Sequence, residues 1–172
     1  MGKPPRAPYA PDPPPEAAPV REPGDLVDAI VEDMDWANRR CLRLAARRAA
    51  LRRCRLTGAD LAEAVLGDVA FSDCRLDLVN LRYARLERVV FSDCRMSECD
   101  LTAAQLTDVL FERCELREAT FSGATVKRVE LRGCDLGGSR GIEALRTARM
   151  PWGDVLANAP SFASALGIEI LE

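Results

Sequence analysis

The chain has 172 residues, with 24 basic and 27 acidic side chains and a net charge of −3. This length allows one domain with a substantial core, and the charge balance excludes the strongly basic surface that binds nucleic-acid phosphates. The sequence contains no histidine, which excludes Ser-His-Asp and Cys-His catalytic arrangements and imidazole metal ligands. We therefore expect a protein that is not an enzyme and that needs no cofactor, metal or nucleic acid.

Residues 1–24 are rich in proline: nine of the eleven prolines lie within the first 23 residues. Proline lacks a backbone N–H and cannot continue a helix or a sheet interior, so we predict a disordered tail over 1–24. The chain shows no signal-peptide pattern and no apolar run long enough to span a membrane, so we expect a cytoplasmic protein without a membrane partner.

Residues 25–48 are compatible with two structures. An amphipathic N-terminal cap helix would bury Leu26, Ala29, Ile30 and Met34. A degenerate first coil would instead bury Trp36, Cys41 and Ala46, which keep the five-residue frame of the next segment. We favour the coil, preceded by a short cap.

Residues 49–138 repeat with a period of five, which matches neither an α-helix nor a simple strand. Every fifth residue from Ala49 is Ala, Val or Cys, and every fifth residue from Leu51 is large and apolar. We predict that the large positions form the core: Leu56, Leu61, Leu66, Phe71, Leu76, Leu81, Leu86, Phe91, Met96, Leu101, Leu106, Phe111, Leu116, Phe121, Val126, Leu131 and Leu136.

The repeat units resemble those of the pentapeptide-repeat family. The clearest units are Ala59-Asp60-Leu61-Ala62-Glu63, Cys99-Asp100-Leu101-Thr102-Ala103 and Cys134-Asp135-Leu136-Gly137-Gly138. The resemblance implies an all-β solenoid, a right-handed quadrilateral β-helix in which four pentapeptides form one coil, with about 4.5–5.5 coils here. It implies no catalytic residues, and it favours a role in binding or scaffolding.

Because four units of five make one coil, residues twenty apart should form columns along the solenoid. Cys54, Cys74, Cys94, Cys114 and Cys134 form one such column. Their spacing of about 4.8 Å would permit disulfides. We interpret the cysteines instead as small apolar residues that fill the inward slot, because Cys99 occupies the same slot in another column.

Three outward columns are candidate surfaces. Arg55, Arg75 and Arg95 form an arginine ladder, either a partner contact or a set of solvated side chains that pair with Asp73, Asp93 and Glu98. Asp68, Arg88, Asp108 and Arg128 alternate in sign, which predicts vertical ion pairs. Ala50, Ala70, Val90 and Leu110 form an apolar column, which we predict to contact a partner, a second copy or a terminal segment.

Residues 139–172 leave the five-residue frame and predict a C-terminal cap. Pro151 marks a helix start, a second short helix ends at Gly167, and residues 168–171 predict a terminal strand. We expect the open end of the last coil to be covered by Leu156, Phe162, Leu166 and Ile168.

These features predict a protein-interaction or scaffold module with an unidentified protein partner, and a homodimer is one option. Some proteins similar to this family mimic DNA, bind type II topoisomerases such as DNA gyrase and confer quinolone resistance, through a strongly acidic dimeric rod. That is the alternative function. This chain departs from it, because its repeat region carries 13 basic against 15 acidic side chains.

Overall fold

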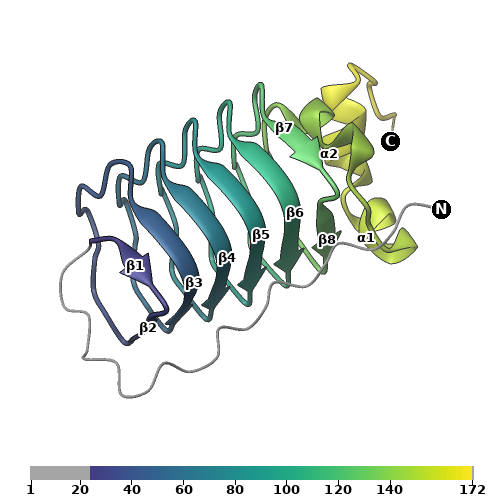
Figure 1. Ribbon diagram of the computed structural model, residues 1–172. Helices are drawn as coiled ribbons and strands as arrows, with labels where there is room; N and C mark the ends of the chain where they lie inside the picture. The colour runs from purple at the N-terminus through teal and green to yellow at the C-terminus, as the bar shows by residue number, and fades with distance from the viewer. Residues whose placement is uncertain (1–23, 172) are drawn as a thin grey trace.

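The computed structural model describes residues 24–171, which form a solenoid of parallel strands with about five turns. Figure 1 shows the strands stacked in a row and the helices gathered at one end. The strands are β1 (Leu26–Val27), β2 (Ile30–Glu32), β3 (Ala45–Arg52), β4 (Val65–Ser72), β5 (Arg85–Ser92), β6 (Gln105–Glu112), β7 (Thr125–Lys127) and β8 (Glu130–Arg132). The predicted all-β solenoid is confirmed.

Each coil is hydrogen-bonded to the next with an offset of twenty residues. Leu66 lies opposite Leu86, and Phe71 lies opposite Phe91. Outside the strands, the isolated bridges keep the same offset except Glu130–Arg149, and the backbone N–H of Leu56 donates to the carbonyl of Arg75 at 2.7 Å. The twenty-residue period of the sequence is therefore the length of one coil.

The core is a set of stacked apolar layers inside the coils. All the large positions named above are buried except Val126, which is partly buried in the last, incompletely covered coil. The rings of Phe71, Phe91 and Phe111 stack almost parallel, with centroids 4.9 and 5.1 Å apart. Each buried Leu or Phe contributes roughly 1.5–3 kcal/mol relative to exposure.

The chain turns at the corners through residues with positive φ. Within residues 24–171, nineteen non-glycine residues have this conformation, and all lie two positions after an inward residue of the five-residue frame. Leu78 and Tyr83, both with φ of 59°, are examples, because their side chains have no polar group that could stabilise the left-handed backbone by a local hydrogen bond to a neighbouring peptide. This conformation costs about 1–2 kcal/mol for an L-residue, so hydrogen bonding between coils must hold the corners in place.

Residues 24–48 wind as the first coil and contain no helix. β1 and β2 pair with β3, and Trp36 and Cys41 are buried in the frame of the repeat. The first coil therefore covers the apolar layer of the second.

Three short helices cover the other end: η1 (Ile142–Thr147), α1 (Trp152–Ala157) and α2 (Ala159–Ala165). The side chain of Asn158, between α1 and α2, is buried against the last coil. Its Oδ1 accepts the Leu136 N–H at 2.8 Å, and its Nδ2 donates to the Cys134 carbonyl at 2.9 Å. Asp154 similarly accepts the Gly133 N–H at 2.6 Å. These side chains form the hydrogen bonds to the last coil that the backbone of a further coil would otherwise form.

Two expectations for the cap were wrong. Residues 168–171 form no strand, because the last coil already bonds to Asn158 and to the Arg149 backbone. Leu156, Leu166 and Ile168 do not cover the open end, since they are 56%, 73% and 57% exposed. The end is covered instead by buried residues of η1, with Phe162 partly buried beside them.

We predict that Asn158→Ala destabilises the solenoid by about 1–3 kcal/mol, because it leaves a buried N–H and a buried carbonyl without partners. Thermal unfolding followed by circular dichroism measures the effect. Ser164→Ala is the control, because Ser164 is exposed in α2. Equal stability of the two variants would contradict this account of the cap.

Candidate interaction surfaces

Each long strand bends at a corner and so contributes to two sides of the coil. In β4 the first side is Val65–Gly67, the corner is Asp68, and the second side is Val69–Ser72. Side chains at equivalent positions of successive strands form vertical columns because the strands are in register. The candidate surfaces are therefore columns rather than clusters from distant parts of the chain.

The predicted apolar column lies on the second side. Ala50, Ala70, Val90 and Leu110 are consecutive partners in the register of β3 to β6. We call these four residues the apolar stripe. Ala50 is buried, and the other three are partly exposed. The stripe ends at Glu130, a buried carboxylate whose Oε1 accepts from Arg132 Nε at 2.5 Å.

Arginine–aspartate pairs border the stripe at both corners. In the Arg88 corner column, which runs through positions 28, 48, 68, 88, 108 and 128, each Asp pairs with the Arg one coil later. Arg88 donates to both carboxylate oxygens of Asp68, at 2.5 and 2.8 Å. Arg128 holds Asp108 in the same two-pronged geometry. The predicted vertical pairing is therefore present.

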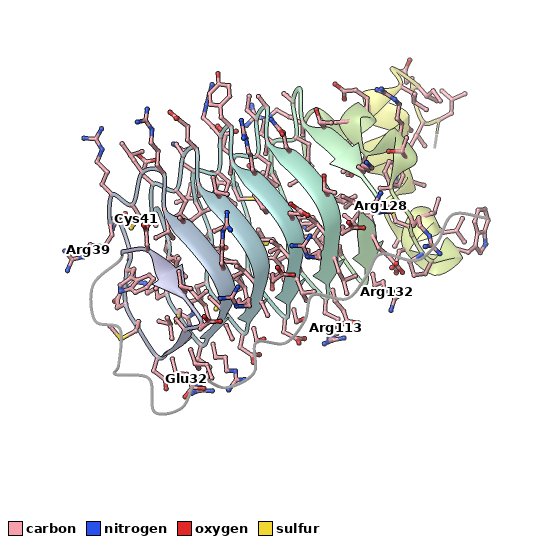
Figure 2. All side chains as sticks on the ribbon, viewed as in Figure 1. Glu32, Arg39, Cys41, Arg113, Arg128 and Arg132 are labelled. Carbon is pink, nitrogen blue, oxygen red and sulfur yellow. The ribbon has the colours of Figure 1, made fainter. Side chains whose placement is uncertain are left out.

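A second corner column, which was not among the predicted columns, contains the ion pairs Asp33–Arg53 and Asp93–Arg113. Arg113 donates to both oxygens of Asp93, at 2.7 and 2.8 Å. Figure 2 shows the Arg113 side chain on the outer surface of the solenoid. The twenty-residue spacing of these pairs is visible in the sequence, so the same reasoning could have found them.

The corner pairs shift the pKa of their carboxyl groups. Hydrogen bonds from Arg88 and Arg128 hold the pKa of Asp68 and of Asp108 below the ordinary aspartate value. The Asp93 pKa is lowered in the same way by Arg113. The structure thus holds these carboxylates in the charged form.

The arginine ladder has different partners from those predicted. Arg55 pairs with Asp35 at 3.2 Å, and Arg95 lies 3.6 Å from Glu115 and 3.8 Å from Asp77. Asp93 is held by Arg113 instead, so the expected pairing with Asp73, Asp93 and Glu98 is wrong. Arg75 lies between Arg55 and Arg95 in the register and has no carboxylate partner within residues 24–171.

The seven cysteines are buried free thiols. In the column from Cys54 to Cys134, each sulfur donates to backbone carbonyls, as Cys74 does to Leu51 at 3.4 Å and to Ser72 at 3.3 Å. Burial raises the pKa of the Cys99 thiol, which disfavours the reactive thiolate. These contacts assign the cysteines a packing role.

The described part of the chain contains no group of three or more Cys, Asp and Glu side chains arranged to hold a metal ion. None of its helices has the length and apolar character needed to cross a bilayer.

Within residues 24–171, more of the exposed large apolar side chains lie in the C-terminal cap than in the repeat. We define the cap surface as Trp152, Leu156, Leu166, Ile168, Ile170 and Leu171, each more than half exposed. Two hollows of about 300 and 480 Å³ lie in the same cap, and both are lined by Leu145 and Phe162. The sequence did not predict this surface, because the expected cap placed three of its residues in the buried interface with the last coil.

Two family models match the chain: pentapeptide repeats (8 copies) over residues 47–77 and a pentapeptide repeat region over residues 80–140. The chain belongs to the pentapeptide-repeat family. The geometry agrees with this assignment, because the corner residues recur every five positions and the paired residues every twenty. A comparison with curated proteins gives no match.

Solved structures of other pentapeptide-repeat proteins are similar to this chain. HetL, involved in heterocyst differentiation regulation in the cyanobacterium Nostoc sp., is 20% identical with a TM-score of 0.48; the match covers 72% of this chain and 65% of HetL. A protein of the Arabidopsis thaliana thylakoid lumen is 17% identical, with coverages of 62% and 70% and a TM-score of 0.45.

The full-length QnrB1, a plasmid-mediated fluoroquinolone resistance protein, is 15% identical with a TM-score of 0.31, and the match covers 84% of this chain and 90% of QnrB1. This chain therefore spans slightly less than two thirds of HetL but most of QnrB1. These identities assign no activity to this chain.

We predict that acid destabilises the pentapeptide solenoid through the Arg88 corner column. Because the pKa of Asp68 and Asp108 is lower in the folded chain than in the unfolded chain, the pairs stabilise the fold above the unfolded pKa, and this contribution is lost as the pH falls through the folded pKa. Thermal unfolding from neutral pH down through about pH 4 to pH 2 measures the loss.

The double variant Asp68→Asn, Asp108→Asn should be less stable than wild type by roughly 0.5–2 kcal/mol at neutral pH, and should lose less stability in acid. Asp73→Asn is the control, because Asp73 has no ion-pair partner among the described residues. An unchanged acid profile in the double variant would contradict the role of these pairs.

Proposed function

We propose that this pentapeptide-repeat protein is a non-enzymatic interaction module that binds a protein partner through the cap surface. The observation that supports the proposal is that six exposed apolar residues belong to the cap at one end of the solenoid. Trp152 is 73% exposed and Leu166 is also 73% exposed. Apolar patches of this kind on a soluble domain mark protein contacts more often than single exposed residues do.

The charged sides of the repeat also favour the cap surface as the site of partner binding. The repeat sides are covered with charged columns, and many of their arginines and aspartates already pair with each other. Paired charges are desolvated only at a cost, so they are poor centres for an interface. The cap has apolar side chains and the two hollows beside Phe162, which suit the buried centre of a protein–protein contact.

DNA mimicry of the gyrase-binding kind has less support. A DNA mimic needs uncompensated negative charge along its length, whereas Asp68, Asp93 and Asp108 each face an arginine. The repeat region has nearly equal numbers of basic and acidic side chains. We therefore propose protein binding without a nucleic-acid-like surface.

The test compares Trp152→Glu, Leu166→Glu with wild type in crosslinking pull-downs and in light scattering after size exclusion. We expect the double variant to bind the partner at least tenfold more weakly, since central apolar contacts are each worth 1–2 kcal/mol or more. If wild type is a dimer and the variant a monomer, the partner is a second copy.

Leu78→Glu is the matched control, because Leu78 is 54% exposed, lies on the repeat, and occupies a corner where Glu98 has the same backbone conformation. It should leave binding unchanged. Binding that survives the cap substitutions, or that is lost equally with Leu78→Glu, would exclude the cap surface.

The apolar stripe is a second contact proposal, because Ala70, Val90 and Leu110 are apolar and partly exposed between two charged corner columns. Val90→Asp, Leu110→Asp should weaken partner binding or self-association tenfold or more in the same assays if the stripe contributes. The Arg55, Arg75 and Arg95 ladder is tested beside it by Arg75→Gln. Unchanged binding and oligomeric state would leave the cap surface alone as the contact.

A further inference from the structure

Gly67 leaves a depression on the first side of the solenoid. In the register it lies between Arg47 of β3 and Glu87 of β5, two residues that carry long side chains. A Cβ built at Gly67 would meet no atom within 4 Å, so the space in front of it is open. The depression has a volume of about 350 Å³, and Val65 forms part of its lining.

Four arginines line this depression, and two of them are already paired. Arg88 binds both oxygens of Asp68 and also contacts Glu87, so it engages both carboxylates of the lining. Arg48 binds Asp28 at 2.6 Å, outside the depression. Arg88 offsets one of the two negative charges of Asp68 and Glu87, so one of the two remaining arginines is needed to offset the other, and the site keeps a net positive charge.

Arg47 and Arg85 are the two remaining arginines, and neither has a carboxylate partner within 4 Å in the described part of the chain. They lie diagonally across β4: in the strand register Arg47 of β3 lies beside Gly67, whereas Arg85 of β5 lies beside Val65. Their coils are two steps apart, about 10 Å along the axis, which two extended arginine side chains can bridge. Both guanidinium groups can therefore reach an anion seated over Gly67.

A second hollow continues from the first. It has a volume of about 570 Å³ and shares Val65 and Arg85 with the depression at Gly67. Tyr83 lines its other part and is 55% exposed, and Val65 is 41% exposed. The combined groove thus has the two arginines without an ion-pair partner at the first hollow and Tyr83 at the second, with Val65 in the lining of both.

We propose that this groove binds a phosphate monoester attached to an aromatic ring. Guanidinium groups bind phosphate oxygens through paired, charge-assisted hydrogen bonds, and Arg47 and Arg85 supply two such groups on opposite sides of Gly67. The ring lies over Val65 and against Tyr83, where an aromatic contact adds to the apolar one. Glycine at position 67 gives the phosphate access to the strand surface.

The experiment titrates the full chain with inorganic phosphate and with phenyl phosphate in a calorimeter at physiological ionic strength. Phenyl phosphate should bind about two- to tenfold more tightly than inorganic phosphate, because only it can contact Tyr83. Arg47→Gln and Arg85→Gln should each weaken both probes about tenfold or more. Tyr83→Asn, which tolerates the positive φ at this corner, should remove only the advantage of phenyl phosphate.

Two further variants separate this site from general attraction between an anion and arginine. Gly67→Val fills the depression without changing charge, and the open space at Gly67 lets the fold accept it; binding of both probes should be lost. Arg75→Gln removes an arginine that is likewise unpaired but does not line the groove, and should leave binding unchanged. The proposal is overturned if Arg75→Gln weakens binding as much as Arg47→Gln, if Gly67→Val still binds phosphate, or if phenyl phosphate binds no more tightly than inorganic phosphate.

Discussion

The structure depends on one constraint: backbone hydrogen bonds between coils hold the strands and bridges of one coil against the residues twenty positions later. Because of this register, residues at equivalent positions of successive coils lie directly above one another along the solenoid axis. Inside, the register stacks Phe71 on Phe91 and Phe111. Outside, it brings corner aspartates such as Asp68 and Asp108 within reach of an arginine from the next coil. Core and surface are therefore two results of the same hydrogen-bonding pattern.

The corner residues show that the register imposes a backbone conformation that their side chains disfavour. Residues such as Leu78 and Tyr83 have the left-handed conformation although their side chains disfavour it. Paired charges recur at two of the corners, so a chain with many charged residues has comparatively little uncompensated charge there. Arg47 and Arg85 beside Gly67 differ from these pairs, because two arginines without an ion-pair partner line one depression.

The two ends of the solenoid are closed differently. The first coil is a normal coil whose backbone bonds to the second, with Trp36 filling its interior. The last coil has no successor, and side-chain groups of Asn158 and Asp154 bond to its backbone instead. Because these polar contacts and η1 complete the end, the apolar residues of the cap are left on the outside. The proposed partner contact is a consequence of how the cap is built.

The period of five predicted the inward residues, and its resemblance to pentapeptide repeats implied the solenoid. The vertical pairing of Asp68 with Arg88 follows, because a repeat stacks every position on its own equivalent. The cap could not be predicted in this way. Leu156, Leu166 and Ile168 are as apolar as Leu136, but their exposure depends on where Asn158 anchors the helices. The groove at Gly67 likewise requires side chains from three coils, so its shape follows from their packing in space. The repeat fold follows from the local five-residue pattern. The structure of the C-terminal cap and the shape of the surface groove arise only when the coils and helices pack together.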